Sequence, residues 1–293
     1  MDEANPASEC ETVVAGRRYL ALLPDATLVH ARLLVLLDPT LPERLRAERL
    51  LAGRQATRLL VLPTLDTMVA AEHTLLLLLA TVRGLLPAYS ELVTGTRLPG
   101  VSSRLTDREV SARNWVGMVE PGWLWGKTLG ILGLGRVGHA VATRAAAFGM
   151  QVRYHDLLPR PDLELRHGFA WGRLDQVLRE ADVVSLHLPL TPDTIRIIDA
   201  PELALMRPDA VLVNTAHGRL IDEGSLIQAL RLGEIGGAGL DVFAYEPIAA
   251  DSPLHGFDNV VLTPHVGGVP PDVGRANLAD RLRAVLLRHG KAA

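Results

Sequence analysis

A glycine-rich segment in the middle of the chain has the residue types and spacing that bind a pyrophosphate. Its pattern G-x-G-x-x-G follows an apolar run at 128–132 and opens a helical pattern at 137–148. The first glycine permits a tight turn, the second lets the backbone approach the phosphates, and the third lets the helix pack on the strand. The pattern alone also occurs in structural turns, but the strand before it and the helix after it favour a dinucleotide site. The predicted cofactor-binding residues are Gly133, Gly135, Arg136, Val137 and Gly138.

Asp156 indicates which dinucleotide binds. It follows the strand predicted at 151–155, where a carboxylate would accept hydrogen bonds from the adenosine ribose hydroxyls. The same negative charge would repel a 2′-phosphate, so the sequence favours NAD over NADP. Arg153 and Arg160 lie near Asp156 in the chain and are expected to keep that preference moderate.

The elements that must position this site alternate regularly from residue 128 onward. Strands are predicted at 128–132, 151–155, 183–188, 210–214, 237–242 and 259–262. Helical patterns separate them at about 136–148, 173–180, 200–206 and 223–232. This alternation predicts an α/β fold with a doubly wound, mainly parallel sheet of the Rossmann type. The loops after such strands gather at the carboxyl edge of the sheet, where the dinucleotide lies.

The first part of the chain shows the same alternation in a shorter form. Runs at 31–37 and 58–62 predict parallel strands, with a helix at 41–51 between them. A long helix is expected from 69 to 93 and a last amphipathic helix from 271 to 288. The stretch 99–126 reads as a crossing segment, because glycine, proline and tryptophan interrupt any period.

Composition excludes several classes of protein. The chain has 293 residues, enough for one large or two ordinary domains, and its 48% hydrophobic content excludes disorder as a whole. A net charge of −3 offers no basic field to nucleic acid or an anionic membrane. The single Cys10 forms no internal disulfide or thiolate zinc site, and no other cluster has metal-ligand spacing. The first eleven residues are polar and acidic, unlike a signal peptide. The apolar run 75–80 is far shorter than the roughly 20 residues of a membrane span. We expect a soluble, cytoplasmic protein.

Polar residues follow the other predicted strands and would meet at the same edge of the sheet. They are His187, Thr215, His217, Asp241, Glu246 and His265, and the apolar Pro189 and Ala216 lie among them in the same loops. With the glycine loop, Asp156 and the segment 69–73, they closely resemble the D-isomer-specific 2-hydroxyacid dehydrogenases. The resemblance covers about residues 58–290. It implies a two-domain, usually dimeric enzyme with a Rossmann NAD-binding domain and a smaller flavodoxin-like substrate domain.

The resemblance also implies a role for several residues. Hydride would pass between nicotinamide and the hydroxyl-bearing carbon of a 2-hydroxy acid. His265 matches the family's general acid/base, Glu246 the carboxylate that pairs with it, and Asp241 the aspartate beside the nicotinamide. An imidazole exchanges protons well near pH 7, and a carboxylate behind it fixes its tautomer. The alternatives are a loop histidine that caps backbone and a solvated turn carboxylate. The remaining cofactor contacts carried over are His187, Pro189, Thr215 and Ala216, with His265 again.

Two departures from the family concern the grip on the substrate carboxylate. The family carries an arginine where this chain has His217, and imidazole lacks the forked, permanently charged donor. Arg219 stands two places on, but neighbouring loop side chains seldom reach the same point. The family also has a longer N-terminal stretch and a glycine-rich loop after the strand predicted at 31–37. Here 38–42 contains no glycine.

The sequence thus predicts a shortened substrate domain at 1–97 plus 267–293 and an NAD-binding domain at 98–266. The leading hypothesis is an NAD-dependent oxidoreductase with an atypical small hydroxy or oxo substrate, in which His265 and Glu246 transfer the proton and His217 lines the pocket. The alternative is a repurposed homologue whose NAD is structural, regulatory or recycled in a redox-neutral reaction. His73 is interpreted as a hydrogen-bonded residue at the domain interface. A homodimer is expected, with Trp115, Trp123 and Trp125 buried against the partner subunit.

Overall fold

A computed structural model of the chain describes residues 12–15, 33–37, 47, 49, 51, 58–62, 64–95, 102–103, 105–108, 113–115, 117–118, 122–269, 273, 277–282 and 284. These residues fall into two compact units, 1–69 with 269–293 and 70–268. The sequence placed its boundaries at 98 and 266 instead, so the helices between 70 and 95 belong by their contacts to the larger unit. The predicted loop 38–42 and Cys10 lie outside the described residues.

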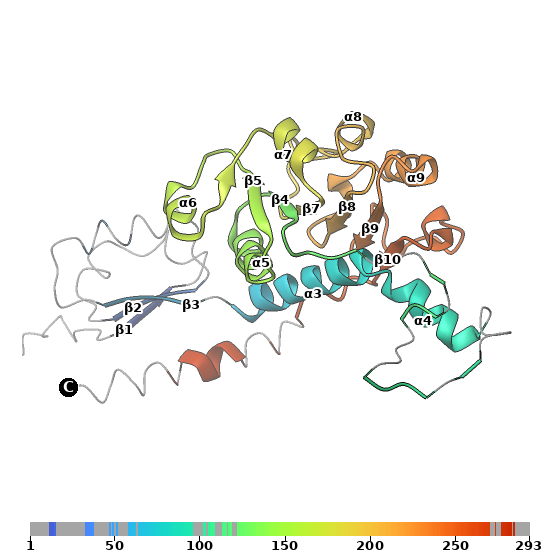
Figure 1. Cartoon of the computed structure of the whole chain (residues 1–293). Helices are drawn as coiled ribbons and strands as arrows, with labels where there is room; N and C mark the ends of the chain where they lie inside the picture. The colour runs from blue at the N-terminus through green and yellow to red at the C-terminus, as the bar shows by residue number, and fades with distance from the viewer. Residues whose placement is uncertain are drawn as a thin grey trace, which may run out of the picture. The chain divides into compact units, whose positions relative to one another are not determined.

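The smaller unit contains a three-stranded parallel sheet (Figure 1). Its order is β1 (Thr12–Ala15), β2 (Leu33–Leu37) and β3 (Arg58–Leu62). The two strands predicted at 31–37 and 58–62 are confirmed, and the β2 side chains from Leu34 to Leu36 are fully buried. Strand β1 was not predicted, because four residues are too short a run to stand out from a loop. Within the predicted helices 41–51 and 271–288, the described residues 47, 49, 51, 273, 277–282 and 284 are helical.

The larger unit is built on a seven-stranded, fully parallel sheet with the order β10-β9-β8-β7-β4-β5-β6. The strands are β4 (Thr128–Leu132), β5 (Gln151–His155), β6 (Ala170–Trp171), β7 (Val183–Leu186), β8 (Val211–Asn214), β9 (Gly237–Leu240) and β10 (Val260–Leu262). The chain order reverses at β4, which pairs with β5 on one side and β7 on the other. The predicted doubly wound sheet is confirmed, and its switch point lies beside the glycine loop.

Helices cover both faces of this sheet (Figure 1). They are α3 (Leu65–Val82), α5 (Arg136–Ala147), α7 (Leu174–Glu180), α8 (Ala200–Leu203) and α9 (Glu223–Leu232). Helices α3 and α5 lie on one face, and α7, α8 and α9 lie on the opposite face. Strands β7 and β8 are buried along their whole length, as expected of parallel strands covered on both sides. Sequence reasoning missed β6 and α6 (Pro161–His167), although Pro161 in the first turn and Gly168 after the last are standard helix boundary signals.

The single helix predicted at 69–93 is wrong, because it is two helices. Helix α3 ends at Val82, and α4 (Leu85–Thr94) begins after Gly84, which has φ 59° and ψ 39°. This left-handed conformation interrupts the helical ladder, and glycine adopts it without a Cβ clash. Helix α3 is long and apolar enough to cross a membrane, but a single helix of this kind is weak evidence for a membrane span. Its Leu77 and Leu78 side chains are fully buried within the structure.

Candidate active site

His265 and Glu246 meet at the carboxyl edge of the larger sheet. The His265 Nδ1 lies 2.7 Å from the Glu246 Oε2, and the Glu246 Oε1 accepts the Phe243 N–H at 3.0 Å. Partial burial opposes ionisation of Glu246, but the hydrogen bonds from the His265 ring and the Phe243 N–H outweigh it and hold the pKa of this carboxyl below its usual range. The carboxylate is therefore charged at neutral pH. The geometry is that of an imidazole oriented through Nδ1 with Nε2 left to exchange a proton.

The turn that carries His265 is fixed by Asp241. This aspartate is 1% exposed. Its Oδ1 accepts the Thr263 hydroxyl at 2.6 Å and the Val266 N–H at 2.9 Å, and its Oδ2 accepts the Gly267 N–H at 2.8 Å. Its backbone carbonyl also accepts the His265 N–H at 2.9 Å. Asp241 thus closes the turn from Thr263 to Gly267.

The glycine loop has the shape that a dinucleotide requires. Gly133 has φ 94°, and a side chain there would press on the His187 carbonyl. A Cβ at Gly138 would overlap the Gly133 carbonyl oxygen, whereas a Cβ at Gly135 would meet only open space. Among the described residues, no side chain caps the N-terminus of α5, which begins directly after Gly135. The open approach at Gly135 and the uncapped helix end fit the pyrophosphate of NAD.

Asp156 lies beside this loop, as predicted, and is held by backbone donors. Its Oδ2 accepts the Leu134 N–H at 2.8 Å and its Oδ1 accepts the Leu157 N–H at 2.8 Å. The two arginines expected to moderate the cofactor preference are each engaged with an acid. Arg160 makes two bonds of 3.1 Å to Asp162, and Arg153 is paired with Glu180.

The loop after β8 is shaped by Asn214, a fully buried residue that sequence reasoning did not select as functional. Its Nδ2 donates to the His217 carbonyl at 2.9 Å, and its Oδ1 accepts the Ala216 N–H at 3.0 Å. An asparagine that ends a buried strand before a predicted site loop was the available signal. A Cβ at Gly218 would overlap the Phe243 carbonyl, so this loop lies directly on the loop that precedes Glu246. The His217 side chain is exposed.

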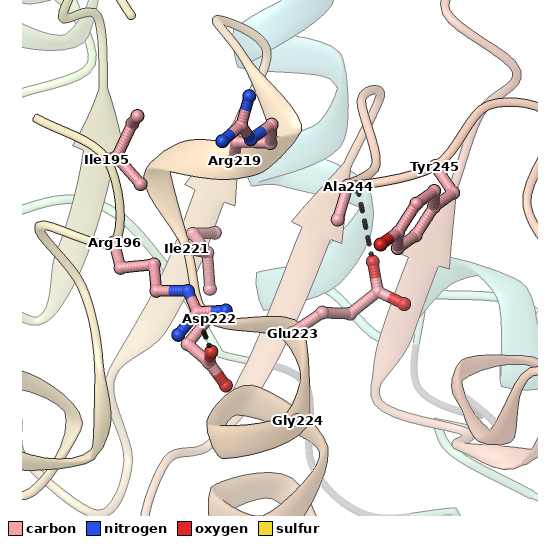
Figure 2. A pocket seen from close by; sticks show the side chains of 9 residues that line it. All are labelled: Ile195, Arg196, Arg219, Ile221, Asp222, Glu223, Gly224, Ala244 and Tyr245. Carbon is pink, nitrogen blue, oxygen red and sulfur yellow. Dashed lines mark hydrogen bonds and ion pairs between the residues drawn. The ribbon is translucent and has the colours of Figure 1, made fainter. Parts of the chain in front are cut away.

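Arg219 belongs to the helical turn η1 (Gly218–Leu220) and lines a cavity of about 560 Å³. Figure 2 shows its side chain at one end of this cavity, apart from the ion pair of 3.3 Å between Arg196 and Asp222. The residues that line the cavity are Ile195, Arg196, Arg219, Ile221, Asp222, Glu223, Gly224, Ala244 and Tyr245. Neither His217 nor His265 is among them. Arg219 therefore lines a cavity that it shares with neither His217 nor His265.

His187 is part of the cofactor edge without being an acid or base at neutral pH. Its Nε2 lies 2.9 Å from the Ser185 Oγ, and burial lowers the pKa of its imidazole to about 3. Its carbonyl packs against Gly133. The Pro189 carbonyl accepts the Thr194 hydroxyl at 2.6 Å, and the Thr215 Oγ1 lies 2.7 Å from the Thr74 Oγ1. These residues shape the loops rather than transfer protons.

Three comparisons with known proteins agree with this geometry. Glyoxylate reductase of Korarchaeum cryptofilum is 43% identical over 174 residues, which are 59% of this chain and 52% of the relative. The chain thus spans about half the length of that relative. The crystal structure of a Thermus thermophilus protein is 32% identical with a TM-score of 0.60 and covers 86% of this chain and 82% of its own. D-lactate dehydrogenase of Aquifex aeolicus, solved with NAD and lactic acid, is 27% identical with a TM-score of 0.59 and covers 91% and 86%.

The family is identified by the part of the chain that forms the larger sheet. Residues 102–267 match the model of the D-isomer specific 2-hydroxyacid dehydrogenase NAD-binding domain. This range contains the glycine loop, Asp156, Asp241, Glu246 and His265, so the family match and the site geometry coincide. The chain therefore belongs to the D-isomer specific 2-hydroxyacid dehydrogenase family, with an NAD-binding Rossmann domain.

Proposed function

We propose that the protein is an NAD-dependent oxidoreductase that interconverts a small 2-hydroxy acid, or a related alcohol, with its oxo form. The observation that carries the proposal is the hydrogen bond of 2.7 Å between His265 and Glu246 at the carboxyl edge of an NAD-binding sheet. Relatives named glyoxylate reductase and D-lactate dehydrogenase support the same class of substrate.

The chain's own residues handle the proton in this reaction. NAD, when bound, supplies the hydride acceptor and, in its reduced form, the donor. His265 takes the hydroxyl proton at Nε2 during oxidation and returns it to the carbonyl oxygen during reduction, while Nδ1 remains bonded to Glu246. Glu246 stabilises the charged imidazole and is itself held by the Phe243 N–H. Asp241 keeps the turn in place.

We propose further that the substrate is atypical for the family, because His217 stands where the family has its carboxylate-binding arginine. An imidazole makes a single hydrogen bond toward a carboxylate, whereas a guanidinium makes two and is always charged. Arg219 does not replace the missing guanidinium, since it lines a cavity that His217 does not line. The binding of the preferred substrate therefore relies less on a carboxylate group than the binding of glyoxylate or lactate would.

NAD is favoured over NADP in this proposal. Two backbone N–H groups hold the Asp156 carboxyl beside the glycine loop, where it would accept hydrogen bonds from the adenosine ribose hydroxyls. Arg160 and Arg153, the cations nearest in sequence, are paired with Asp162 and Glu180. A 2′-phosphate would thus meet a carboxylate without a free guanidinium from either arginine.

The test is a reductive assay with a panel of 2-oxo acids, aldehydes and ketones. Oxidation of NADH, followed by its absorbance, is expected with at least one panel member. NADPH is expected to be the poorer cofactor by about fivefold or more, since one like-charge contact costs upwards of about 1 kcal/mol. Tight NADH binding with no turnover of any member would contradict the proposal and favour the redox-neutral alternative.

We also propose that the protein is a homodimer formed through α4 and the crossing segment. No residue of α4 is buried, although it carries Leu85, Tyr89 and Leu92, which are about half exposed or more. Trp115 and Trp123 are exposed on the same unit. Apolar patches of this kind are typical of subunit interfaces.

Sedimentation velocity tests the dimer. The expected mass is twice the 31.7 kDa of one chain, and Tyr89→Arg should shift the population toward monomer because it buries a charge in the interface. Leu157→Arg, at an exposed position outside this patch, is the control. A monomeric wild-type protein at micromolar concentration would refute the dimer.

A further inference from the structure

We propose that His73 is a positioning residue for His265, acting through Asp241 and Thr263 on the turn that presents the imidazole. This inference rests on the proposed function, in which His265 exchanges the proton. Sequence reasoning gave His73 only a structural role at the domain interface. All of the residues involved lie in the larger unit, within 70–268.

Helix α3 brings His73 to the site along a strip of small residues on β9. A Cβ at Gly237 would lie 3.2 Å from the Thr81 Cγ2, and a Cβ at Gly239 would lie 3.0 Å from the Leu77 Cβ. Four residues of helix rise about 6 Å and two residues of strand rise about 6.6 Å. Every fourth residue of α3 therefore faces every second residue of β9. The next step pairs His73 with Asp241. The two glycines therefore let the helix approach closely enough for this contact.

His73 donates to the centre of the hydrogen-bond network. Its Nε2 lies 2.9 Å from the Thr263 Oγ1 and 3.1 Å from the Asp241 Oδ1. The Thr263 hydroxyl gives its own proton to Asp241. The His73 Nε2 must therefore carry hydrogen and donate it to the Thr263 Oγ1, because the Thr263 hydroxyl has already given its proton to Asp241. His73 reaches this network from outside the turn, its Nε2 pairs with the Asp241 carboxylate, and its side chain is 10% exposed.

The turn needs this external support because its backbone is strained. His265 has φ 53°, a left-handed conformation in which the Cβ of a non-glycine residue crowds the backbone. The Val266 and Gly267 N–H groups hold the turn by bonding the two Asp241 oxygens. A Cβ at Gly267 would lie 2.8 Å from the Asp241 Oδ2 and 3.1 Å from the His73 Cδ2, so the three residues are closely packed. Removing the His73 ring takes away the donor to Thr263 and the partner of the buried Asp241 carboxylate, which frees the turn to move.

The experiment compares His73→Leu with His73→Gln. Leucine removes the donor, and kcat is expected to fall by about 10²-fold with the KM for NADH unchanged, because a displacement of about 1 Å at the reacting group costs that much. Glutamine places an N–H near the position of Nε2 and should restore most of kcat. Thr81→Val is the matched control on the same face of α3, since the Thr81 hydroxyl bonds only to the Leu77 carbonyl among the interactions of the described residues, and it should behave as wild type.

Hydrogen–deuterium exchange gives a readout that does not depend on activity. In the protein without cofactor, the amides of Val266 and Gly267 should exchange several-fold faster in His73→Leu than in wild type or Thr81→Val. Unchanged exchange, an equal increase in Thr81→Val, or an unchanged kcat in His73→Leu would each overturn the inference. If the leucine variant does not fold, His73→Asn, whose amide is too short to reach Asp241, replaces it. A wild-type protein that turns over nothing refutes the proposed function, while the exchange comparison still decides whether His73 holds the turn.

Discussion

Replacing His265 by asparagine is expected to lower the turnover of any substrate found in the panel by about 10²- to 10⁴-fold, the usual contribution of a general acid or base. Asparagine retains an amide that can bond to Glu246 but cannot exchange a proton near neutral pH. The measurement is steady-state NADH oxidation, with NADH binding followed separately by fluorescence. Binding should persist, because the glycine loop and Asp156 are not altered.

A matched control and a partner variant sharpen this result. His255→Asn removes another exposed imidazole, whose Nε2 lies 3.2 Å from the Ala249 carbonyl oxygen, and should leave turnover unchanged. Glu246→Gln should cause a smaller loss than His265→Asn, because it keeps the ring but removes the charge that stabilises its protonated form. Full activity in His265→Asn would exclude this residue as the acid/base.

His217→Arg is the substitution with the largest expected gain. The arginine would restore the forked cation that grips a substrate carboxylate, and kcat/KM for glyoxylate or pyruvate should rise by about 10²- to 10³-fold, the range for one donor that polarises a reacting carbonyl. His217 is exposed at the start of η1, so a longer side chain meets little hindrance. Steady-state kinetics on 2-oxo acids and on matched neutral carbonyl compounds measure the effect.

The neutral compounds are the internal comparison in that experiment, since their turnover should not rise with the arginine. His217→Lys should give a smaller gain, because an ammonium supplies charge without the planar fork. Arg219→Ala should change neither set, because its side chain lines the other cavity. If His217→Arg leaves 2-oxo acid turnover unchanged, the missing arginine is not what limits this class of substrate.

Local patterns were enough to predict most of the larger unit. Strands β4 and β5 and helix α9 were predicted at the residues where they occur, and the other predicted strands of the sheet differ by one or two residues. Parallel strands covered on both faces are continuous apolar runs, and the glycine loop sits at a fixed place between a strand and a helix. The sequence failed where the signal was short or a single residue changed the conformation, as at β1, at β6 and at Gly84 between α3 and α4.

The sequence by itself determined the type of fold and the dinucleotide loop, because both depend on residue types at fixed spacing. It predicted Asp156 as the acidic residue at the ribose position, and its resemblance to the family implied the candidate acid/base pair. Tertiary structure alone decided that Arg160 is paired with Asp162, that Arg219 lines a cavity that His217 does not line and that His73 is paired with Asp241. His73 and Asp241 are far apart in the chain, and they meet because two glycines of β9 let α3 lie close to the sheet. Contacts of that kind depend on the distance between packed elements, which no local pattern of residues specifies.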